Sequence, residues 1–127
     1  MLWLWVVGYL VMDAIYVGLS REYYLGRVAG IAGAAPKDAV KVGLCALAAY
    51  ALMALGWATI VVPSVRKGRV LAAAKTGALY GLVLYGVFNA TTGAMFDKWG
   101  WTVMARDTAW GTASIAAYTA VYAKFAS

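Results

Sequence analysis

The sequence contains no histidine and only one cysteine, and these scarcities exclude several kinds of site. Without histidine the chain cannot form a His-dependent catalytic triad, a His-ligated zinc or haem site, or an imidazole proton shuttle. The single cysteine, Cys45, cannot form an intrachain disulfide or a thiolate metal cluster, and we expect it to be a small packing residue. A Gly-rich nucleotide-binding loop is also absent. The sequence therefore predicts neither a cofactor nor a metal site.

Charged residues are scarce as well. They make up 13% of the chain, whereas hydrophobic residues make up 65%. An ordinary soluble domain is about half apolar and about a quarter charged. A soluble fold of 127 residues could not bury this much apolar surface, whereas lipid can solvate it. The composition predicts a multi-pass integral membrane protein. The net charge of +6 predicts that its basic side chains bind membrane lipids with anionic headgroups rather than nucleic acid.

Four apolar runs are long enough, or nearly so, to cross a bilayer as helices of about 20 residues. The predicted spans cover residues 2–19, 40–62, 70–93 and 104–124. Transmembrane barrel strands would instead alternate over segments of about ten residues. The sequence therefore predicts a single all-α transmembrane domain over residues 1–127, an integral membrane four-helix bundle with up-down-up-down order.

The connections differ in length. The segment Ser20–Ala39 is the longest, and we expect it to be a partly interfacial loop, because its three glycines and Pro36 disfavour a long stable helix. Pro63 is expected to end the second span, and Ser64–Gly68 to form a tight turn. Three of the four residues in Arg66–Arg69 are basic, which favours placing this turn and both termini on the cytoplasmic, matrix or stromal side.

Two further patterns concern the ends and the faces of the spans. Tryptophans near predicted span ends are expected to anchor at the headgroup level, and these are Trp3, Trp5, Trp57, Trp99 and Trp101. Small residues at helical spacing indicate close helix–helix seams, either within the bundle or between protomers. The predicted seams are Ala73, Gly77 and Gly81 on the third span, and Gly111, Ser114 and Ala117 on the fourth.

Asp13 is an acidic residue inside the first apolar run. An ionised carboxylate at mid-membrane costs about 2.5–3.5 kcal/mol on insertion scales, so such a group is expected to be paired, hydrated or protonated. In an antiparallel bundle Asp13, Asn89, Thr92 and Asp107 fall towards the same leaflet. Aromatic residues share their helix faces, and these are Tyr9, Tyr16, Tyr85 and Trp110. We predict that these eight residues form a polar, ligand-binding pocket, with Arg106 and Arg21 as contacts for an anionic headgroup.

Each polar residue also has a purely structural interpretation. Asp107 near a helix start would complement the helix dipole or pair with Arg106. Asn89 and Thr92 would supply interhelical hydrogen bonds, worth about 0.6 kcal/mol each. Asp13 would pair with a tyrosine hydroxyl or with Asn89.

The polar residues of the third and fourth spans lie within a longer pattern. It reads Tyr85-x-x-Phe88-Asn89-x-Thr91-Thr92, then Trp99, then Asp107-x-x-Trp110-Gly111. This pattern, together with the four-span layout, resembles the small bacterial and algal membrane proteins grouped as domain of unknown function 2177. The resemblance implies a four-span fold with a shared polar site, and it implies no assigned biochemistry.

The resemblance also has two departures. The family typically shows an aromatic-Asp-Leu-Thr-Asn run on the third span, a loop tryptophan, an Asp-x-x-Trp-Gly and an Asp midway through the first span. Six positions fit, namely Asp13, Thr91, Trp99, Asp107, Trp110 and Gly111. Asn89 stands where the family usually has Asp, and Thr92 where it has Asn. The resemblance therefore implies one carboxylate fewer in this chain.

These observations favour a small membrane protein that binds or transports a polar solute, an ion or a lipid headgroup. The alternative is a structural or accessory subunit docked on a larger bacterial or organellar membrane complex. The partners expected from the sequence are membrane lipids and either further copies of the chain in a homo-oligomer or such a complex. A lipid-modifying enzyme has the least support, because the chain lacks a nucleophile–base pair, a metal site and a cofactor motif. No residue is therefore predicted to be catalytic.

Overall fold

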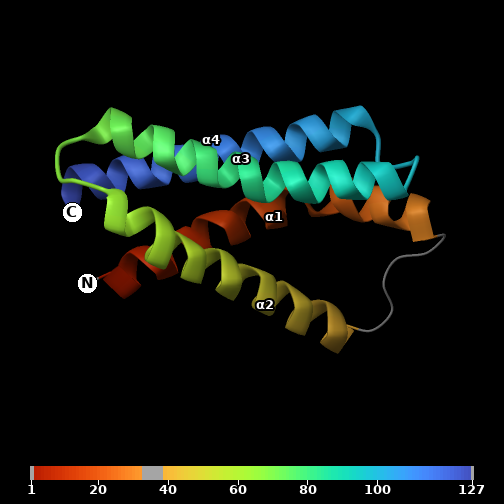
Figure 1. Cartoon of the computed structure of the whole chain (residues 1–127). Coiled ribbons are helices and arrows are strands. Elements are labelled where there is room, and N and C mark those ends of the chain that lie inside the picture. The colour runs from red at the N-terminus through yellow and green to blue at the C-terminus, as the bar shows by residue number, and fades with distance from the viewer. Residues whose placement is uncertain (1, 33–38, 127) are drawn as a thin grey trace. The chain divides into compact units, whose positions relative to one another are not determined.

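The computed structural model describes residues 2–32 and 39–126, and nearly all of them are helical (Figure 1). The four α-helices are α1 (Leu2–Ala32), α2 (Ala39–Gly56), α3 (Val70–Met95) and α4 (Trp101–Phe125). A five-residue π-helix, η1 (Trp57–Val61), and a short 3₁₀-helix, η2 (Val62–Ser64), follow α2 directly. The described residues contain no β-strand. The predicted all-α class with four helices is therefore confirmed.

Three of these helical segments are long and apolar enough to cross a membrane: Leu2–Ser20, Gly43–Ser64 and Val70–Met95. They support the prediction of an integral membrane protein. Helix α4 has 25 residues, but threonines, tyrosines and the charged Arg106, Asp107 and Lys124 lower its apolar character. The fourth span and the up-down-up-down order stay predictions.

The chain divides into two compact units, Met1–Gly56 and Trp57–Ser127. In the first unit, α1 is longer than the sequence led us to expect. It has 31 residues and continues through Gly26 and Gly30 to Ala32, so the expectation that the chain leaves the helix after the first span is wrong. A glycine inside a helix costs only about 1 kcal/mol relative to alanine. The combined cost of two glycines is therefore too small to end the helix. Pro36 lies outside the described residues.

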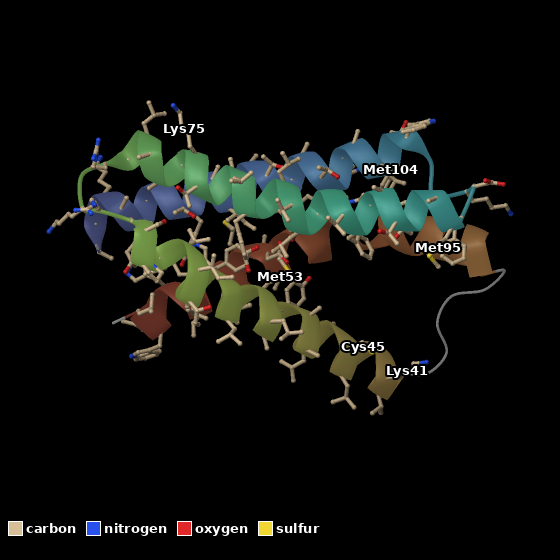
Figure 2. All side chains as sticks on the ribbon, in the orientation of Figure 1. Lys41, Cys45, Met53, Lys75, Met95 and Met104 are labelled. Carbon is tan, nitrogen blue, oxygen red and sulfur yellow. The ribbon has the colours of Figure 1, made fainter. Side chains whose placement is uncertain are left out.

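Cys45 lies on α2 and is exposed (Figure 2). The expectation that it is a packing residue is therefore wrong. Most of α2 around it is exposed and apolar, including Leu44 and Leu47, which are 62% and 67% exposed. A thiol behaves as a small hydrophobe, so it fits this apolar surface as well as it would fit a core.

In the second unit, α3 and α4 run antiparallel and pack side by side (Figure 1). A turn over residues 96–100 joins them, closed by a hydrogen bond from the Trp99 N–H to the Phe96 carbonyl at 3.0 Å. The contacts follow an antiparallel register, in which Gly77 faces Thr119, Gly81 faces Gly111 and Gly93 faces Met104. Figure 2 shows Met104 on α4 near this turn.

The α3–α4 interface depends on the absence of side chains. Ala73, Gly77 and Gly81 are all buried, as predicted for a seam. A Cβ atom added at Gly77 would lie 2.6 Å from the Ile115 carbonyl oxygen, and one at Gly81 would lie 2.8 Å from the Gly111 carbonyl carbon. The two backbones are therefore in direct contact, which is the packing that small residues permit in membrane helices.

The predicted seam of α4 is partly wrong. Gly111 and Ser114 are buried, but Ala117 is exposed. The buried positions continue instead through Ile115 and Thr119, which are 1% and 0% exposed. The buried face of α4 thus follows positions spaced by four residues. The predicted seam included only small residues, so it differs from the buried face after Ser114.

At the opposite end from the 96–100 turn, η2 leads into α3 through a second turn. Pro63 lies in the first positions of η2, and the chain then becomes extended at Val65, so the predicted end of the second apolar segment is confirmed. Gly68 has a φ of 83°, a left-handed conformation that favours glycine. Its N–H donates to the Ala123 carbonyl at 3.0 Å, and this bond fixes the turn to the last turns of α4.

Trp57 packs within the second unit. Its ring is 1% exposed, and its indole N–H donates to the Thr119 hydroxyl oxygen at 3.1 Å. The ring also contacts Tyr118 and Tyr122, with centroids 5.6 Å and 5.3 Å away. The expectation that Trp57 anchors at the headgroups is therefore wrong, because α4 covers both its apolar surface and its polar edge.

The first prediction concerns the backbone contact between α3 and α4. Gly81→Ala is expected to lower the free energy of unfolding by about 1–3 kcal/mol, because the added methyl group overlaps the Gly111 backbone. Gly86→Ala is the matched control, since its Cβ would meet only Leu82 Cδ1 at 3.9 Å. Thermal unfolding in detergent, followed by circular dichroism, measures both. Equal unfolding temperatures for the two variants would contradict the contact.

The second prediction concerns Trp57. Thr119→Val removes the hydroxyl oxygen that accepts from the indole N–H, and is expected to destabilise the protein by about 1–3 kcal/mol. Thr112→Val makes the same substitution on the same helix, where the hydroxyl bonds only its own helix at Thr108. The free energy of unfolding of Thr112→Val is expected to differ from that of the wild type by no more than about 0.5 kcal/mol. Unfolding followed by tryptophan fluorescence distinguishes the two, and equal losses would contradict a specific role for the indole bond.

Candidate functional site

The side chain of Asn89 connects α3, the following turn and α4. It is 1% exposed. Its Nδ2 donates to the Asp107 Oδ2 at 2.7 Å and to the Tyr85 carbonyl at 2.8 Å. Its Oδ1 accepts from the Trp99 Nε1 at 3.0 Å. An indole N–H can only donate and a backbone carbonyl can only accept, so these contacts fix which end of the amide is oxygen and which is nitrogen.

Trp99 is the least expected member of this group. Its ring is 7% exposed, whereas the nearby Trp101 is 85% exposed. The Trp99 ring also packs edge-on against Phe88, with centroids 6.3 Å apart and an interplanar angle of 85°. The expectation of a headgroup anchor is therefore wrong for Trp99, while Trp101 remains free of protein cover. The backbone bond to Phe96 holds Trp99 in the turn, and from there its indole N–H donates to Asn89.

Gly111 completes the contact from the side of α4. A Cβ atom added there would overlap the ring of Tyr85. Gly111 follows Asp107 by one helical turn, and Tyr85 precedes Asn89 by one helical turn. The two helices therefore meet through two stacked pairs, the Tyr85 ring on Gly111 and the Asn89 amide on Asp107. The absence of a side chain at Gly111 lets the helices approach closely enough for the second pair to form.

The depth of this cluster agrees with the sequence-based expectation. Asn89 lies six residues before Met95, the end of α3, and Asp107 lies six residues after Trp101, the start of α4. At 1.5 Å per residue, each is about 9 Å from the turn. The prediction that Asn89 and Asp107 reach the same depth is confirmed by their hydrogen bond.

The structural interpretations are also partly resolved. Asn89 does make an interhelical hydrogen bond, whereas the Thr92 hydroxyl donates to the Phe88 carbonyl of its own helix at 2.7 Å. The first turn of α4 contains no acidic residue, and Asp107 lies beyond it. Complementing the helix dipole, an effect confined to the first turn, therefore does not account for Asp107. Its side chain is half-buried.

The remaining predicted site residues are distributed over two helices. On α1, Tyr9 and Asp13 are 2% and 1% exposed, and Tyr16 is half-buried. The Arg21 side chain lies outside the described residues. On α4, Trp110 is half-buried and Arg106 is exposed. Since α1 belongs to the first compact unit, convergence of its residues with Asn89 and Asp107 stays a prediction.

The chemistry open to this cluster is that of a single oriented carboxylate. Within the described residues, no three His, Cys, Asp or Glu side chains group as metal ligands would. Trp99 was missed as a site residue, although it stands in the pattern that carries the family resemblance. Its position near a span end is typical of an anchor, so only that pattern could have indicated its hydrogen bond.

The comparisons with known proteins address the family. No curated protein and no solved structure matches the chain. The sequence pattern of the family described as "Predicted membrane protein (DUF2177)" matches residues 1–124. That match spans both compact units and includes Asp13, Asn89, Trp99 and Asp107. The chain therefore belongs to this family of predicted membrane proteins, as the resemblance implied.

Proposed function

We propose that this protein binds a small polar solute, an ion or a lipid headgroup in one leaflet of the membrane, with Asp107 as the principal contact. The observation that supports the proposal most is the hydrogen bond of 2.7 Å between Asn89 Nδ2 and Asp107 Oδ2. The Asp107 carboxylate lies about 9 Å along α4 from the 96–100 turn. Keeping a charged group in an apolar surrounding costs free energy. Asn89 orients that carboxylate without cancelling its charge, because an amide is neutral.

The complementary ligand carries a positive charge or a hydrogen-bond donor. Charge-assisted hydrogen bonds to a carboxylate contribute about 1.5–3 kcal/mol each. In the proposal, Asn89 and Trp99 are positioning residues, because they fix the carboxylate and do not themselves have to meet the ligand. Tyr85 and Trp110 contribute the aromatic surface on the same two helices.

The sequence-based prediction also assigns residues of α1 and a further residue of α3 to ligand binding. Asp13, Tyr9 and Tyr16 share one face of α1, and Thr92 extends the polar face of α3. Arg106 of α4 would hold the anionic part of a zwitterionic headgroup.

The third prediction tests Asp107. Asp107→Asn is expected to weaken retention of the bound molecule by about 10- to 100-fold, since it removes a charge-assisted contact. Asp97→Asn is the matched control, because Asp97 is an exposed carboxylate in the neighbouring turn. The untagged protein would be extracted gently from its native membrane, and the masses of the protein and of its retained molecules measured. Asp13→Asn, treated alike, tests whether α1 contributes to the same site.

The outcomes are distinct. A molecule retained by the wild type and by Asp97→Asn, but lost from Asp107→Asn, supports the proposal. Equal retention in Asp97→Asn and Asp107→Asn contradicts it. Migration with a large assembly, together with tolerance of Asp107→Asn, would instead favour the accessory-subunit alternative and leave the Asn89–Asp107 bond a purely structural contact.

The fourth prediction tests the positioning role of Trp99. Trp99→Phe keeps an aromatic ring against Phe88 but removes the N–H that the Asn89 carbonyl accepts. The variant is expected to lose about 1–3 kcal/mol of stability, and ligand retention should fall with the altered carboxylate. Trp101→Phe, at a ring 85% exposed, is the control and should change neither quantity. Unchanged stability and retention in Trp99→Phe would contradict the role.

A further inference from the structure

Basic side chains gather at the end of the Trp57–Ser127 unit that lies opposite the Asn89–Asp107 cluster. The hydrogen bond of 3.0 Å from Gly68 N–H to the Ala123 carbonyl joins the turn before α3 to the last turns of α4. It brings the exposed side chains of the turn to the same end as those of the α4 terminus. We call this group the basic end, and its members are Arg66, Lys67, Arg69, Lys75 and Lys124. Figure 2 shows Lys75 extending from the first turns of α3.

The basic end contains no acidic side chain of its own unit. The sequence has no Asp or Glu from residue 39 to residue 96, and none after Asp107. The two acidic side chains of the unit, Asp97 and Asp107, belong to the other end of the α3–α4 pair. Five positive side chains are therefore concentrated at one end, and the carboxylates of the unit are separated from them by most of the length of α3.

The basic end lies where the chain is expected to reach the membrane surface. Its turn lies between two segments that are apolar and long enough to span, Gly43–Ser64 and Val70–Met95. Apolar side chains next to it are exposed, including Ile60 at 68% and Leu71 at 69%. Lys75 lies about 7.5 Å into α3, a depth from which a lysine reaches the surface by extending along the helix. The Lys124 Nζ lies 5.3 Å from the Phe125 ring centroid, so this cation also lies beside an apolar side chain.

We propose that the basic end binds anionic phospholipid headgroups of the leaflet that it faces. The charge complementarity and the headgroup-level position carry this inference, and it does not depend on the ligand of Asp107. A soluble acidic protein or a nucleic acid would also match the charge, but neither is favoured by basic residues that directly flank apolar segments. Each Lys or Arg near an anionic surface contributes about 1 kcal/mol, which is about a fivefold effect on affinity.

The test is a titration of the purified full chain in detergent with dioleoyl-phosphatidylglycerol or dioleoyl-phosphatidylcholine, with bound lipids counted by native mass measurement. The wild type is expected to bind the anionic lipid more tightly. Arg66→Gln/Arg69→Gln is expected to weaken phosphatidylglycerol binding about 25-fold, a factor of about five for each charge. Binding of phosphatidylcholine should not change. Lys67→Gln/Lys124→Gln provides a second variant in case the first affects the turn.

The matched control removes two positive charges elsewhere. Lys41→Gln/Lys98→Gln changes two exposed lysines that do not belong to the basic end, and it should bind phosphatidylglycerol as the wild type does. Equal weakening in this control would show a net-charge effect and would overturn the inference. Equal wild-type affinity for both lipids would overturn it as well. Loss of the Asp107 ligand in Asp107→Asn with unchanged phosphatidylglycerol binding would separate this inference from the proposed function.

Discussion

The direct backbone contact between α3 and α4 is the constraint on which the rest of the second unit depends. Gly77, Gly81 and Gly111 have no side chains at the points where the two helices touch, and a Cβ atom at any of them would overlap its neighbour. Lipid tails are as apolar as leucine, so the association relies on van der Waals contact and interhelical hydrogen bonds. Close approach makes both available, because the short side chain of Asn89 reaches Asp107 at 2.7 Å.

Asn89 explains why this chain can keep Asp107 oriented without a second carboxylate. Its amide donates to Asp107 and Tyr85 while it accepts from Trp99, so three of its hydrogen-bonding positions are used. The family resemblance puts an aspartate at this position. An aspartate would repeat the bond to Asp107 only with a bridging proton, since two ionised carboxylates repel each other. The amide carries its donor hydrogens at any pH, so the bond in this chain does not depend on a proton.

The sequence predicted features that follow from the bilayer and from helical spacing, and it failed where tertiary contacts decide. The four helices and the Ala73–Gly81 seam were predicted because long apolar runs and small residues have few other uses. Trp57 and Trp99 were misassigned because an anchor and a buried hydrogen-bond donor have the same position near a span end. The continuation of α1 beyond the first apolar run was missed because glycine disfavours a helix without preventing it. The partners of Asp13 stay a prediction.

The two ends of the second unit differ in their polar side chains. Helix α3 has 26 residues and is about 39 Å long, which is enough to separate two polar environments across a hydrocarbon core. Asn89, Asp107 and Trp99 lie towards the turn that ends this helix, whereas Arg66, Lys67 and Arg69 precede its start. Cytoplasmic leaflets are the anionic ones, and basic loops are retained on that side. A basic end held there would place Asp107 nearer the opposite face, so the proposed ligand would reach this carboxylate from the non-cytoplasmic side.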